Sequence, residues 1–198
     1  MKKIKNNTNK IHNGRFFMVK KCVTTIMTAL IICISSVTFA AMNPFSDVPK
    51  SHWAYDDVTN LAANGIISPY EDGTFMGNKN ATRYEAAVMV ANLYCKKKNI
   101  TFYRYKNPFS DISPKHWAAD AITTLVADGI EKGEDYHDGT FRGNRDITHG
   151  ELRNLLNNLF EVIGVESRMK ANKDNEDEPI TRYELAATLN RVYKALFD

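Results

Sequence analysis

Three stretches of the chain share one pattern of hydrophobic and polar positions. Each stretch opens with a Thr that is followed three residues later by a Glu, and apolar residues then recur four, eight, eleven and twelve residues after the Thr. The Thr-x-x-Glu start is a capping box, in which the two side chains bond free backbone amides in the first turn of a helix. The apolar spacing places those residues on one helical face. The pattern therefore predicts three helices, beginning after Thr82, Thr148 and Thr181, each with one face to bury.

A shorter helix is predicted ahead of the first two of these starts. Residues 53–61 and 117–125 carry Trp, Ala, Val or Ile, and Leu at helical spacing, and each run leads to a glycine suited to closing a helix, Gly65 or Gly129. An Asp-Gly turn dipeptide between aromatic residues follows in both copies. The predicted unit is thus a front helix, a glycine stop, an aromatic-flanked turn and a capped helix.

The sequence contains two complete copies of this unit and one partial copy. Residues 43–47 return unchanged as residues 107–111, and residues 82–85 return letter for letter as 181–184. A repeat of this length predicts an array of similar supersecondary units. The stretch before the third capping box is too short for a front half, so a mainly all-α fold of two full units and one half unit is expected. The predicted division is unit 1 at 43–95, a linker at 96–106, unit 2 at 107–163, a polar loop at 164–179 and unit 3, a half unit, at 180–198.

Residues 1–40 have the layout of a secretory signal peptide. They contain seven Lys or Arg and no Asp or Glu, and an apolar run from Cys22 to Ile34 leads to small residues up to Ala40. A membrane anchor is the alternative, but a bilayer span needs about 20 apolar residues, more than this run supplies. Met18 offers a second start site. We expect an exported protein of the cell envelope, in the periplasm or the cell wall, with no transmembrane segment in its mature part.

Removal of this leader changes the net charge from +3 to −4, because 19 Lys and Arg then face 23 Asp and Glu. The basic balance of the whole sequence therefore belongs to the leader and gives no support to nucleic-acid binding. Cys95 alone remains, so no internal disulfide can form. It aligns with Lys194 and is expected at the surface, with intermolecular pairing as the less favoured option. His52 and His116 recur without further ligands, and the sequence shows no catalytic triad or phosphate loop, so we expect no metal, no cofactor and no enzyme.

The order of motifs in the repeat resembles the S-layer homology (SLH) family. Phe-x-Asp-Val, His-Trp-Ala, Gly-Ile, Tyr-x-Asp-Gly-Thr-Phe and Thr-Arg-x-Glu follow one another, and the combination covers nearly all of residues 43–197. The resemblance implies non-catalytic modules that attach exported proteins to the cell wall by binding peptidoglycan or secondary wall polysaccharides. It also implies SLH-type helix-loop-helix repeats in pseudo-threefold symmetry around a central three-helix bundle of the capped helices, with ligand in the grooves between units.

Two departures from the common family pattern are present. Tyr84 and Tyr183 stand where an Ala is usual, and Gly77 and Gly143 stand where many members have Pro. With these residues the sequence is similar to SLH segments of outer-membrane proteins in two-membraned bacteria, where the module binds peptidoglycan from the periplasmic side.

Arg83 and Arg182 are the first candidate ligand-binding residues. Each follows the capping Thr beside a helix N-terminus, which favours an anion, and a guanidinium is a planar bidentate donor suited to carboxylate. The resemblance assigns this Arg to acidic groups of a wall polymer, and a salt bridge to a nearby Asp or Glu is the alternative. Unit 2 carries His149 at this position. Along the sequence, Arg83 keeps a complete front half and Arg182 does not, so binding is expected to survive best at Arg83.

Trp53, Trp117, Asp47 and Asp111 complete the predicted ligand-binding set. The tryptophans occupy apolar-face positions, so one interpretation makes them core anchors. In the other, a partly exposed indole stacks on sugar rings, since Trp offers a large apolar face with a polar handle. The aspartates either cap or brace the front helix or contact ligand.

The linker mixes basic and aromatic residues. Lys96, Lys97 and Lys98 precede Phe102, Tyr103, Arg104 and Tyr105. The favoured interpretation is a solvated linker with a few docking aromatics, and the alternative is a surface suited to an anionic polymer.

The predicted function is a non-catalytic attachment module of the cell envelope that binds peptidoglycan or a wall-linked secondary polysaccharide. Several weak grooves would gain from multivalency on a repeating polymer. The alternative is a structural or assembly protein, in which a second copy or another SLH-bearing protein fills the surface left by the missing front half.

Overall fold

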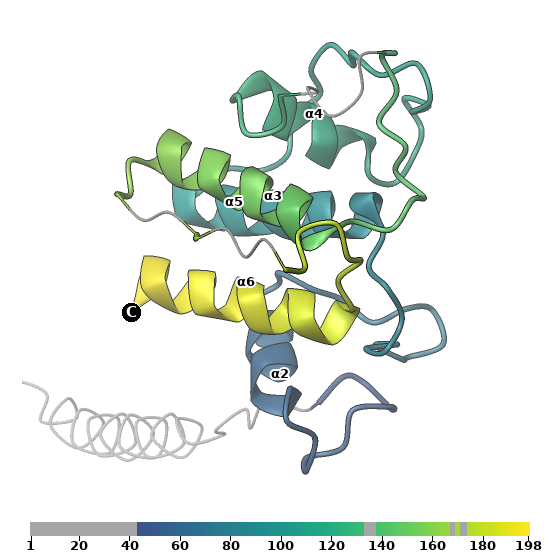
Figure 1. The fold of residues 1–198 in the computed structure, drawn as a ribbon, viewed down its shortest axis with the longest axis vertical. Helices are drawn as coiled ribbons and strands as arrows, with labels where there is room; N and C mark the ends of the chain where they lie inside the picture. Colours follow the sequence, from purple (N-terminus) through teal and green to yellow (C-terminus); the bar gives the residue numbers. More distant parts are fainter. Residues whose placement is uncertain (1–42, 133–137, 167–168, 171–173) are drawn as a thin grey trace, which may run out of the picture. The chain divides into compact units, whose positions relative to one another are not determined.

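The computed structural model describes residues 43–132, 138–166, 169–170 and 174–198. These described residues contain five α-helices and no strand, which confirms the mainly α-helical fold (Figure 1). None of these helices is long and apolar enough to cross a membrane. The leader predicted for residues 1–40 lies outside the described residues, and residues 41–198 form a compact unit of their own. The helices are α2 (Tyr55–Ala63), α3 (Arg83–Lys98), α4 (Ala119–Ala127), α5 (His149–Ile163) and α6 (Arg182–Phe197).

The three predicted capping boxes are confirmed. In α3 the hydroxyl oxygen of Thr82 accepts a hydrogen bond from the Glu85 amide at 3.2 Å, and the Glu85 carboxylate accepts one from the Thr82 amide at 2.8 Å. The same reciprocal pair begins α5 and α6. Because both side chains are engaged, each long helix starts one residue after its Thr, as the sequence predicted.

The front helices α2 and α4 are shorter at their N-termini than predicted. They begin at Tyr55 and Ala119, two residues after Trp53 and Trp117. Helical spacing therefore does not place either indole on a buried face, and both residues are 63% exposed. The core-anchor interpretation is wrong for both tryptophans. The glycine stop is confirmed, because Gly65 closes α2 at a φ of 72°.

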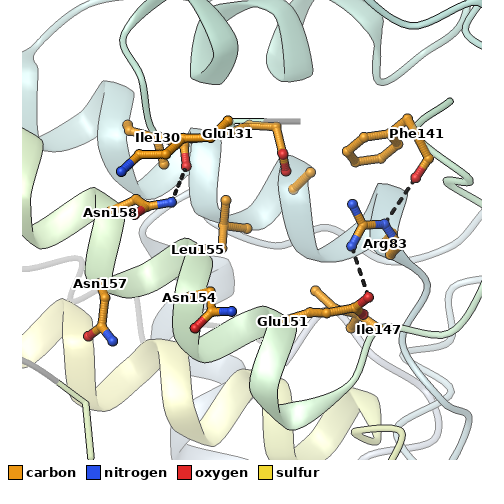
Figure 2. A pocket seen from close by; sticks show the side chains of 12 residues that line it. Arg83, Ile130, Glu131, Phe141, Ile147, Glu151, Asn154, Leu155, Asn157 and Asn158 are labelled. Carbon is orange, nitrogen blue, oxygen red and sulfur yellow. Dashed lines mark hydrogen bonds and ion pairs between the residues drawn. The ribbon is translucent and has the colours of Figure 1, made fainter. Parts of the chain in front are cut away.

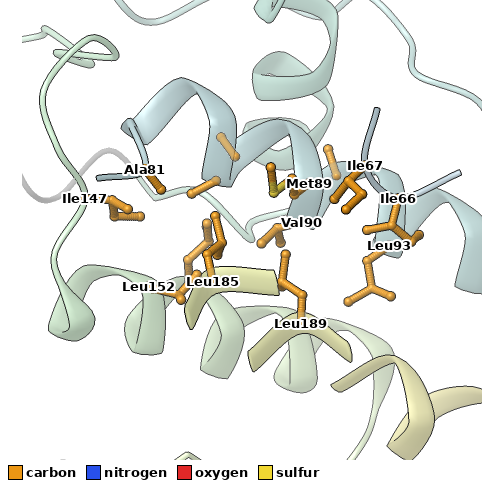
Figure 3. Close-up of a cluster of buried hydrophobic side chains, with 14 of the residues drawn as sticks. Ile66, Ile67, Ala81, Met89, Val90, Leu93, Ile147, Leu152, Leu185 and Leu189 are labelled. Atoms are coloured by element: carbon orange, nitrogen blue, oxygen red, sulfur yellow. The ribbon is translucent and has the colours of Figure 1, made fainter. Parts of the chain in front are cut away.

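The apolar faces of the capped helices meet in one core (Figure 3). α3 packs against both α5 and α6. Val90, Leu152, Leu185 and Leu189 come from all three helices and are at most 2% exposed. Since full burial of such a side chain contributes about 1.5–3 kcal/mol, this shared core is a main source of stability.

Each front helix covers a capped helix of a different unit. α2 of unit 1 packs on α6 of unit 3, and α4 of unit 2 packs on α3 of unit 1 (Figure 1). The units are therefore interlocked, because neither front helix packs on the capped helix that follows it in sequence.

Backbone hydrogen bonds close the three units into a ring. The residue before each capping Thr donates to the equivalent residue of another unit: Ala81 to Ile180 at 2.9 Å, Ile180 to Ile147 at 3.1 Å, and Ile147 to Ala81 at 2.9 Å. All three residues are buried. This cycle gives the pseudo-threefold arrangement within one chain, although unit 3 lacks a front helix.

Cys95 is buried, which contradicts the surface position expected from its alignment with Lys194. The residue is 6% exposed. Tyr103 of the linker and Asp128 at the end of α4 both interact with it, so this side of α3 is covered. Burial, followed by the charge of Asp128, raises the pKa of the thiol to about 11. A thiol with that pKa stays protonated at neutral pH, which disfavours intermolecular disulfide pairing.

Candidate functional site

Each capped helix begins against the turn region of another unit. At the start of α3 the amide of Tyr84 donates to the carbonyl of Gly143 in unit 2 at 2.9 Å, and at the start of α6 the amide of Tyr183 donates to Gly77 in unit 1 at 2.9 Å. The arginine of one unit therefore faces the front half of another unit. The expectation that Arg182 lacks a front half is wrong, because it lies against the complete front half of unit 1.

The third junction is formed by the end of the polar loop. The amide of Gly150 at the start of α5 donates to the carbonyl of Glu176 at 2.9 Å. Glu176 thus occupies the place that Gly77 and Gly143 hold in the two full units. A Cβ on Gly150 would lie 2.6 Å from the Glu176 side chain. Glycine at this position of unit 2 therefore leaves room for the loop that packs against it.

The two candidate arginines are buried between units. Arg83 and Arg182 are 4% and 3% exposed. The Nε of Arg83 donates to the carbonyl of Phe141 at 3.0 Å, and its guanidinium pairs with Glu151 at 3.3 Å (Figure 2). Arg182 makes the corresponding bond to a unit 1 carbonyl at 2.8 Å and pairs with Glu85 at 3.1 Å. The structure therefore shows the salt bridge that was the alternative for these residues, and direct contact with ligand stays a prediction.

Each arginine comes from one unit and contacts two groups of another unit, its capping carboxylate and a carbonyl of its turn. Glu85 caps α3 while pairing with Arg182, and it also accepts a hydrogen bond from the hydroxyl of Tyr70. Burial opposes ionisation of Glu85, but the bonds from the Thr82 amide and Tyr70, with the charge of Arg182, lower the pKa of its carboxyl. Burial and the bond to Glu85 raise the pKa of Tyr70 to about 12. Glu85, Arg182 and Tyr70 therefore form a fixed polar cluster rather than an acid–base pair.

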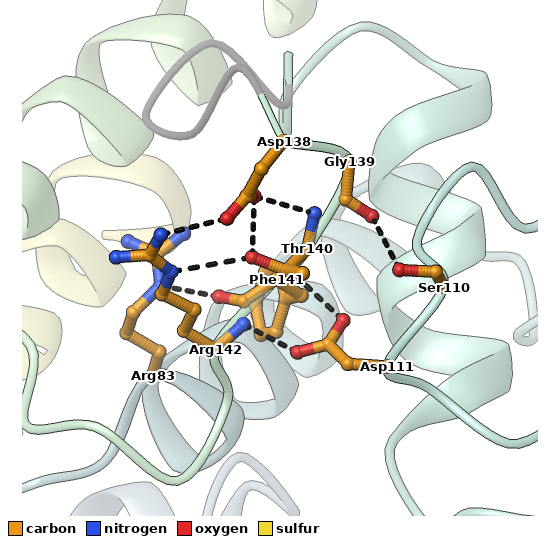
Figure 4. A network of polar contacts seen from close by, with 8 residues as sticks. All are labelled: Arg83, Ser110, Asp111, Asp138, Gly139, Thr140, Phe141 and Arg142. Atoms are coloured by element: carbon orange, nitrogen blue, oxygen red, sulfur yellow. Dashed lines mark hydrogen bonds and ion pairs between the residues drawn. The ribbon is translucent and has the colours of Figure 1, made fainter.

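The aspartates brace the aromatic-flanked turns rather than the front helices. Asp111 accepts hydrogen bonds from the amides of Phe141 and Arg142, both at 2.7 Å (Figure 4). Asp47 does the same in unit 1, bonding the Phe75 amide at 2.7 Å and the following amide at 2.8 Å. Arg142 takes a φ of 54°, a conformation that costs a non-glycine residue energy, and the Asp carboxylate offsets this cost. A bracing role was expected, but the braced element differs, and ligand contact stays a prediction.

A stack of aromatic rings lies outside the two junctions formed by Tyr183 and Tyr84. The His52 ring lies 4.1 Å from that of Tyr183, and Trp53 lies 5.9 Å from the same Tyr. In the second copy, Tyr84 lies 4.2 Å from His116 and 6.0 Å from Trp117. The two His that recur in the sequence are therefore ring partners of a Tyr from another unit, and this stack orients the exposed Trp.

The Tyr rings explain the two departures from the common family pattern. A Cβ built on Gly143 would lie 2.2 Å from the ring of Tyr84, and one on Gly77 would lie 2.1 Å from the ring of Tyr183. Each Tyr therefore requires a glycine in the turn that it packs against. The paired departures in the sequence were the available signal for this contact.

We expect Gly143→Ala to lower the free energy of unfolding by about 1–3 kcal/mol, because the added methyl overpacks the Tyr84 ring. In the Tyr84→Ala background the same substitution should be nearly neutral, since the clashing ring is gone. Urea unfolding of the two single variants and the double variant measures the coupling. Equal costs of Gly143→Ala in both backgrounds would contradict the contact.

Groove A lies in unit 1, between α3 and residues 66–71. It is lined by Tyr70, Glu85, Asn92 and Arg182, with Trp117 of unit 2 at the same opening. Apolar side chains, including Ile66 and Met89, form its floor. Groove A therefore combines an exposed indole with a buried guanidinium and an amide.

Groove B is the equivalent groove in unit 2, between α5 and residues 130–132 (Figure 2). It contains Arg83 and Glu151, together with Asn154, Asn157 and Asn158. Among the described residues that line it there is no tryptophan, because the front half that would supply one is absent from unit 3.

Groove C lies between α5, α6 and the polar loop. Trp53 stands at its opening, and His149 takes the place of the arginine. Arg153 and Glu176, which pair with each other, also line it. Groove C thus has the indole without the arginine, and groove B has the arginine without the indole.

Sequence reasoning missed Tyr70, Asn92 and Asn158 as groove residues. Asn92 donates to the carbonyl of Ile66 at 3.0 Å, and Asn158 donates to that of Ile130 at 3.0 Å. The recurrence of Asn at one position of an otherwise apolar pattern was the signal. These bonds fix the segment after each glycine stop and so shape grooves A and B.

Comparison with known proteins supports the repeat and its register. The model of the S-layer homology domain matches residues 44–87 and 108–152. The two matched segments contain the front halves and the beginnings of α3 and α5.

Several relatives share these segments. The chain is 45% identical over 75 residues to Outer membrane protein SlpA of Thermus thermophilus, covering 38% of this chain and 8% of that protein. It is 49% identical over 65 residues to Outer membrane protein alpha of Thermotoga maritima, covering 32% of this chain and 16% of that protein. It is 36% identical over 118 residues to the Cellulosome-anchoring protein of Acetivibrio thermocellus, covering 59% and 26%. The chain thus spans only a small part of the length of these relatives.

Proposed function

We propose, from the premise that this chain belongs to the S-layer homology family, that it is a non-catalytic attachment module of the cell surface. In this proposal it binds peptidoglycan or a wall-linked secondary polysaccharide through the grooves between its units. The relative named as a cellulosome-anchoring protein, which covers 59% of this chain, supports an anchoring role.

The exposed Trp117 at groove A is the observation that carries the proposal. The residue is 63% exposed although it is a large apolar side chain, and such side chains at a concave site commonly mark ligand contact. Tyr84 and His116 hold the indole from behind, so little side-chain entropy is lost when a sugar ring stacks on it. Trp53 repeats the arrangement at groove C.

Groove A is the principal groove in this proposal. It has both an indole, Trp117, and the arginine that follows a capping Thr, Arg182. Groove B has no tryptophan among its described lining residues, and groove C has His149 in place of that arginine. This ranking replaces the expectation that binding survives best at Arg83. An acidic group of the polymer that enters groove A would meet Arg182 beside Glu85, while the sugar ring lies on Trp117.

The structure favours attachment over assembly through the missing front half. On α6, Asn190 bonds Asp57 and Asn60 of the front helix α2. The equivalent residue on α5 is Asn157, which accepts a hydrogen bond from the amide of Met169 at 2.8 Å. The chain's own loop therefore occupies part of the face that the front helix of a partner would use.

Sedimentation of residues 41–198 with purified cell walls tests the proposed function. We expect binding to peptidoglycan, measured with and without its attached polymers, so that the two preparations identify the ligand. Light scattering after size exclusion should show a monomer. A stable oligomer that stays in solution beside both wall preparations would overturn the proposal in favour of assembly.

A further inference from the structure

The linker carries a concentration of positive charge in an otherwise acidic mature chain. Residues 86–110 contain no Asp or Glu, but Lys96, Lys97, Lys98, Arg104 and Lys106 fall within them. The grooves described above do not use this segment. Its charge therefore needs a separate explanation.

The linker is a continuous exposed strip in the structure. Every residue from 96 to 106 is exposed. Four large apolar or aromatic side chains stand among the basic ones, and they are well exposed: Ile100 at 41%, Phe102 at 37%, Tyr103 at 38% and Tyr105 at 55%. Exposed apolar side chains that are grouped and rimmed by polar residues are a feature of interaction surfaces.

The strip is held in place rather than free. The amide of Tyr103 donates to the hydroxyl oxygen of Thr124 in α4 at 3.0 Å. Lys97 bonds the carbonyl of Leu196 near the end of α6. Because Lys97 lies in the last turn of α3 and contacts α6, and Tyr103 is bonded to α4, the segment between them is attached to helices at both of these points.

Two carboxylates face the strip and offset part of its charge. Asp120 pairs with Arg104 at 3.1 Å, and burial, with the nearby charge of Asp128, raises the pKa of the Tyr103 hydroxyl to about 12. The four lysines of the segment, at 96, 97, 98 and 106, remain as an excess of positive charge beside the exposed apolar side chains.

We propose that residues 96–106 form a docking surface for an anionic phospholipid membrane. Lysines near an anionic bilayer are attracted to it, and aromatic and aliphatic side chains partition into its interface. A glycan is the less fitting partner, because Ile100 and Phe102 offer no hydrogen-bonding group to its hydroxyls. The inference does not rest on the proposed wall binding, and with it the chain would join a wall polymer to a membrane surface.

Vesicle flotation of residues 41–198 tests this docking surface. This segment is used because it is a compact unit and because residues 1–40 carry seven basic residues of their own. We expect flotation with mixed phosphatidylglycerol–phosphatidylcholine vesicles, little with phosphatidylcholine alone, and release at high salt. Lys96→Ala with Lys98→Ala should weaken binding by at least tenfold, at about fivefold for each lysine. Phe102→Ser should weaken it as well.

A matched double variant, Lys50→Ala with Lys115→Ala, removes two exposed lysines elsewhere on the chain and should leave flotation nearly unchanged. Equal losses in the two double variants would overturn the proposal, because they would show a response to net charge alone. Binding to soluble polygalacturonate, lost with Lys96 and Lys98 while vesicles are ignored, would overturn it in favour of an anionic glycan.

Discussion

Replacement of Trp117 by Ala is expected to weaken cosedimentation with purified cell walls by about tenfold or more. The indole is the exposed apolar surface of groove A, and tenfold corresponds to about 1.4 kcal/mol, a modest loss for an aromatic anchor at a binding site. Stability should change little, because the residue is 63% exposed and surface substitutions usually shift the free energy of unfolding by no more than about 0.5 kcal/mol. Binding isotherms against a fixed amount of wall material, with thermal unfolding alongside, measure both effects.

Two matched variants test whether wall binding depends on the indole of groove A in particular or on exposed aromatic side chains in general. Trp53→Ala removes the equally exposed indole of groove C, which lacks the arginine, and should cost less than Trp117→Ala. Tyr105→Ala removes a 55% exposed ring from the linker and should leave wall binding intact. Unchanged wall binding in Trp117→Ala, with the wild-type protein bound, would refute the assignment of groove A as the principal groove.

Replacement of Arg182 by Met is expected to lower the free energy of unfolding by about 3 kcal/mol at pH 7. Removing one partner of a buried ion pair leaves the other charge uncompensated, and such losses are about 3–5 kcal/mol. We expect the lower end because Glu85 keeps its bonds from the Thr82 amide and from Tyr70. The carbonyl of Phe75 also loses its donor. Chemical denaturation followed by circular dichroism measures the change.

The loss in Arg182→Met should shrink as the pH falls. The folded-state pKa of Glu85 is lowered in part by Arg182, so the stability that this shift contributes is present above the unfolded pKa and disappears as pH falls through the folded pKa. The difference between the two proteins should therefore be largest near neutral pH and smaller at about pH 3, below the ordinary pKa of Glu.

Arg191→Met is the matched control for this prediction. It removes an exposed arginine from the same helix, and its cost should stay within about 0.5 kcal/mol. Adding Glu85→Gln to Arg182→Met should recover part of the loss, because the buried carboxylate would no longer be charged. A loss in Arg182→Met that is the same at both pH values would show that the ion pair contributes little.

Local sequence signals were sufficient for the helix starts and for the core. The Thr-x-x-Glu pairs act within one turn, so the start of α3, α5 and α6 depends on neighbours in sequence. The same holds for the apolar stripe, because residues such as Val90 and Leu189 face one side of their own helix wherever that helix is placed. Cys95 was misplaced by this reasoning, since its burial depends on Tyr103 and Asp128 from other segments.

The same reasoning could not predict which residues line each groove. Reading along the chain assigns Arg83 to unit 1 and Arg182 to unit 3, but the hydrogen bonds of Tyr84 and Tyr183 place each arginine against a different unit's turn. The exposure of Trp117 likewise follows from where α4 begins and from the Tyr84 ring behind it, and neither is encoded in the spacing of one repeat.

The sequence alone determined that this protein is an array of similar units with three capped helices, because capping and helical periodicity are set by residues within a few positions of one another. Only the tertiary structure decided which residues share a groove, because the ring of units joins positions that lie more than a hundred residues apart, as Phe75 and Arg182 do. The proposed principal groove is for this reason the one that contains Trp117 and Arg182, whereas the sequence had favoured Arg83.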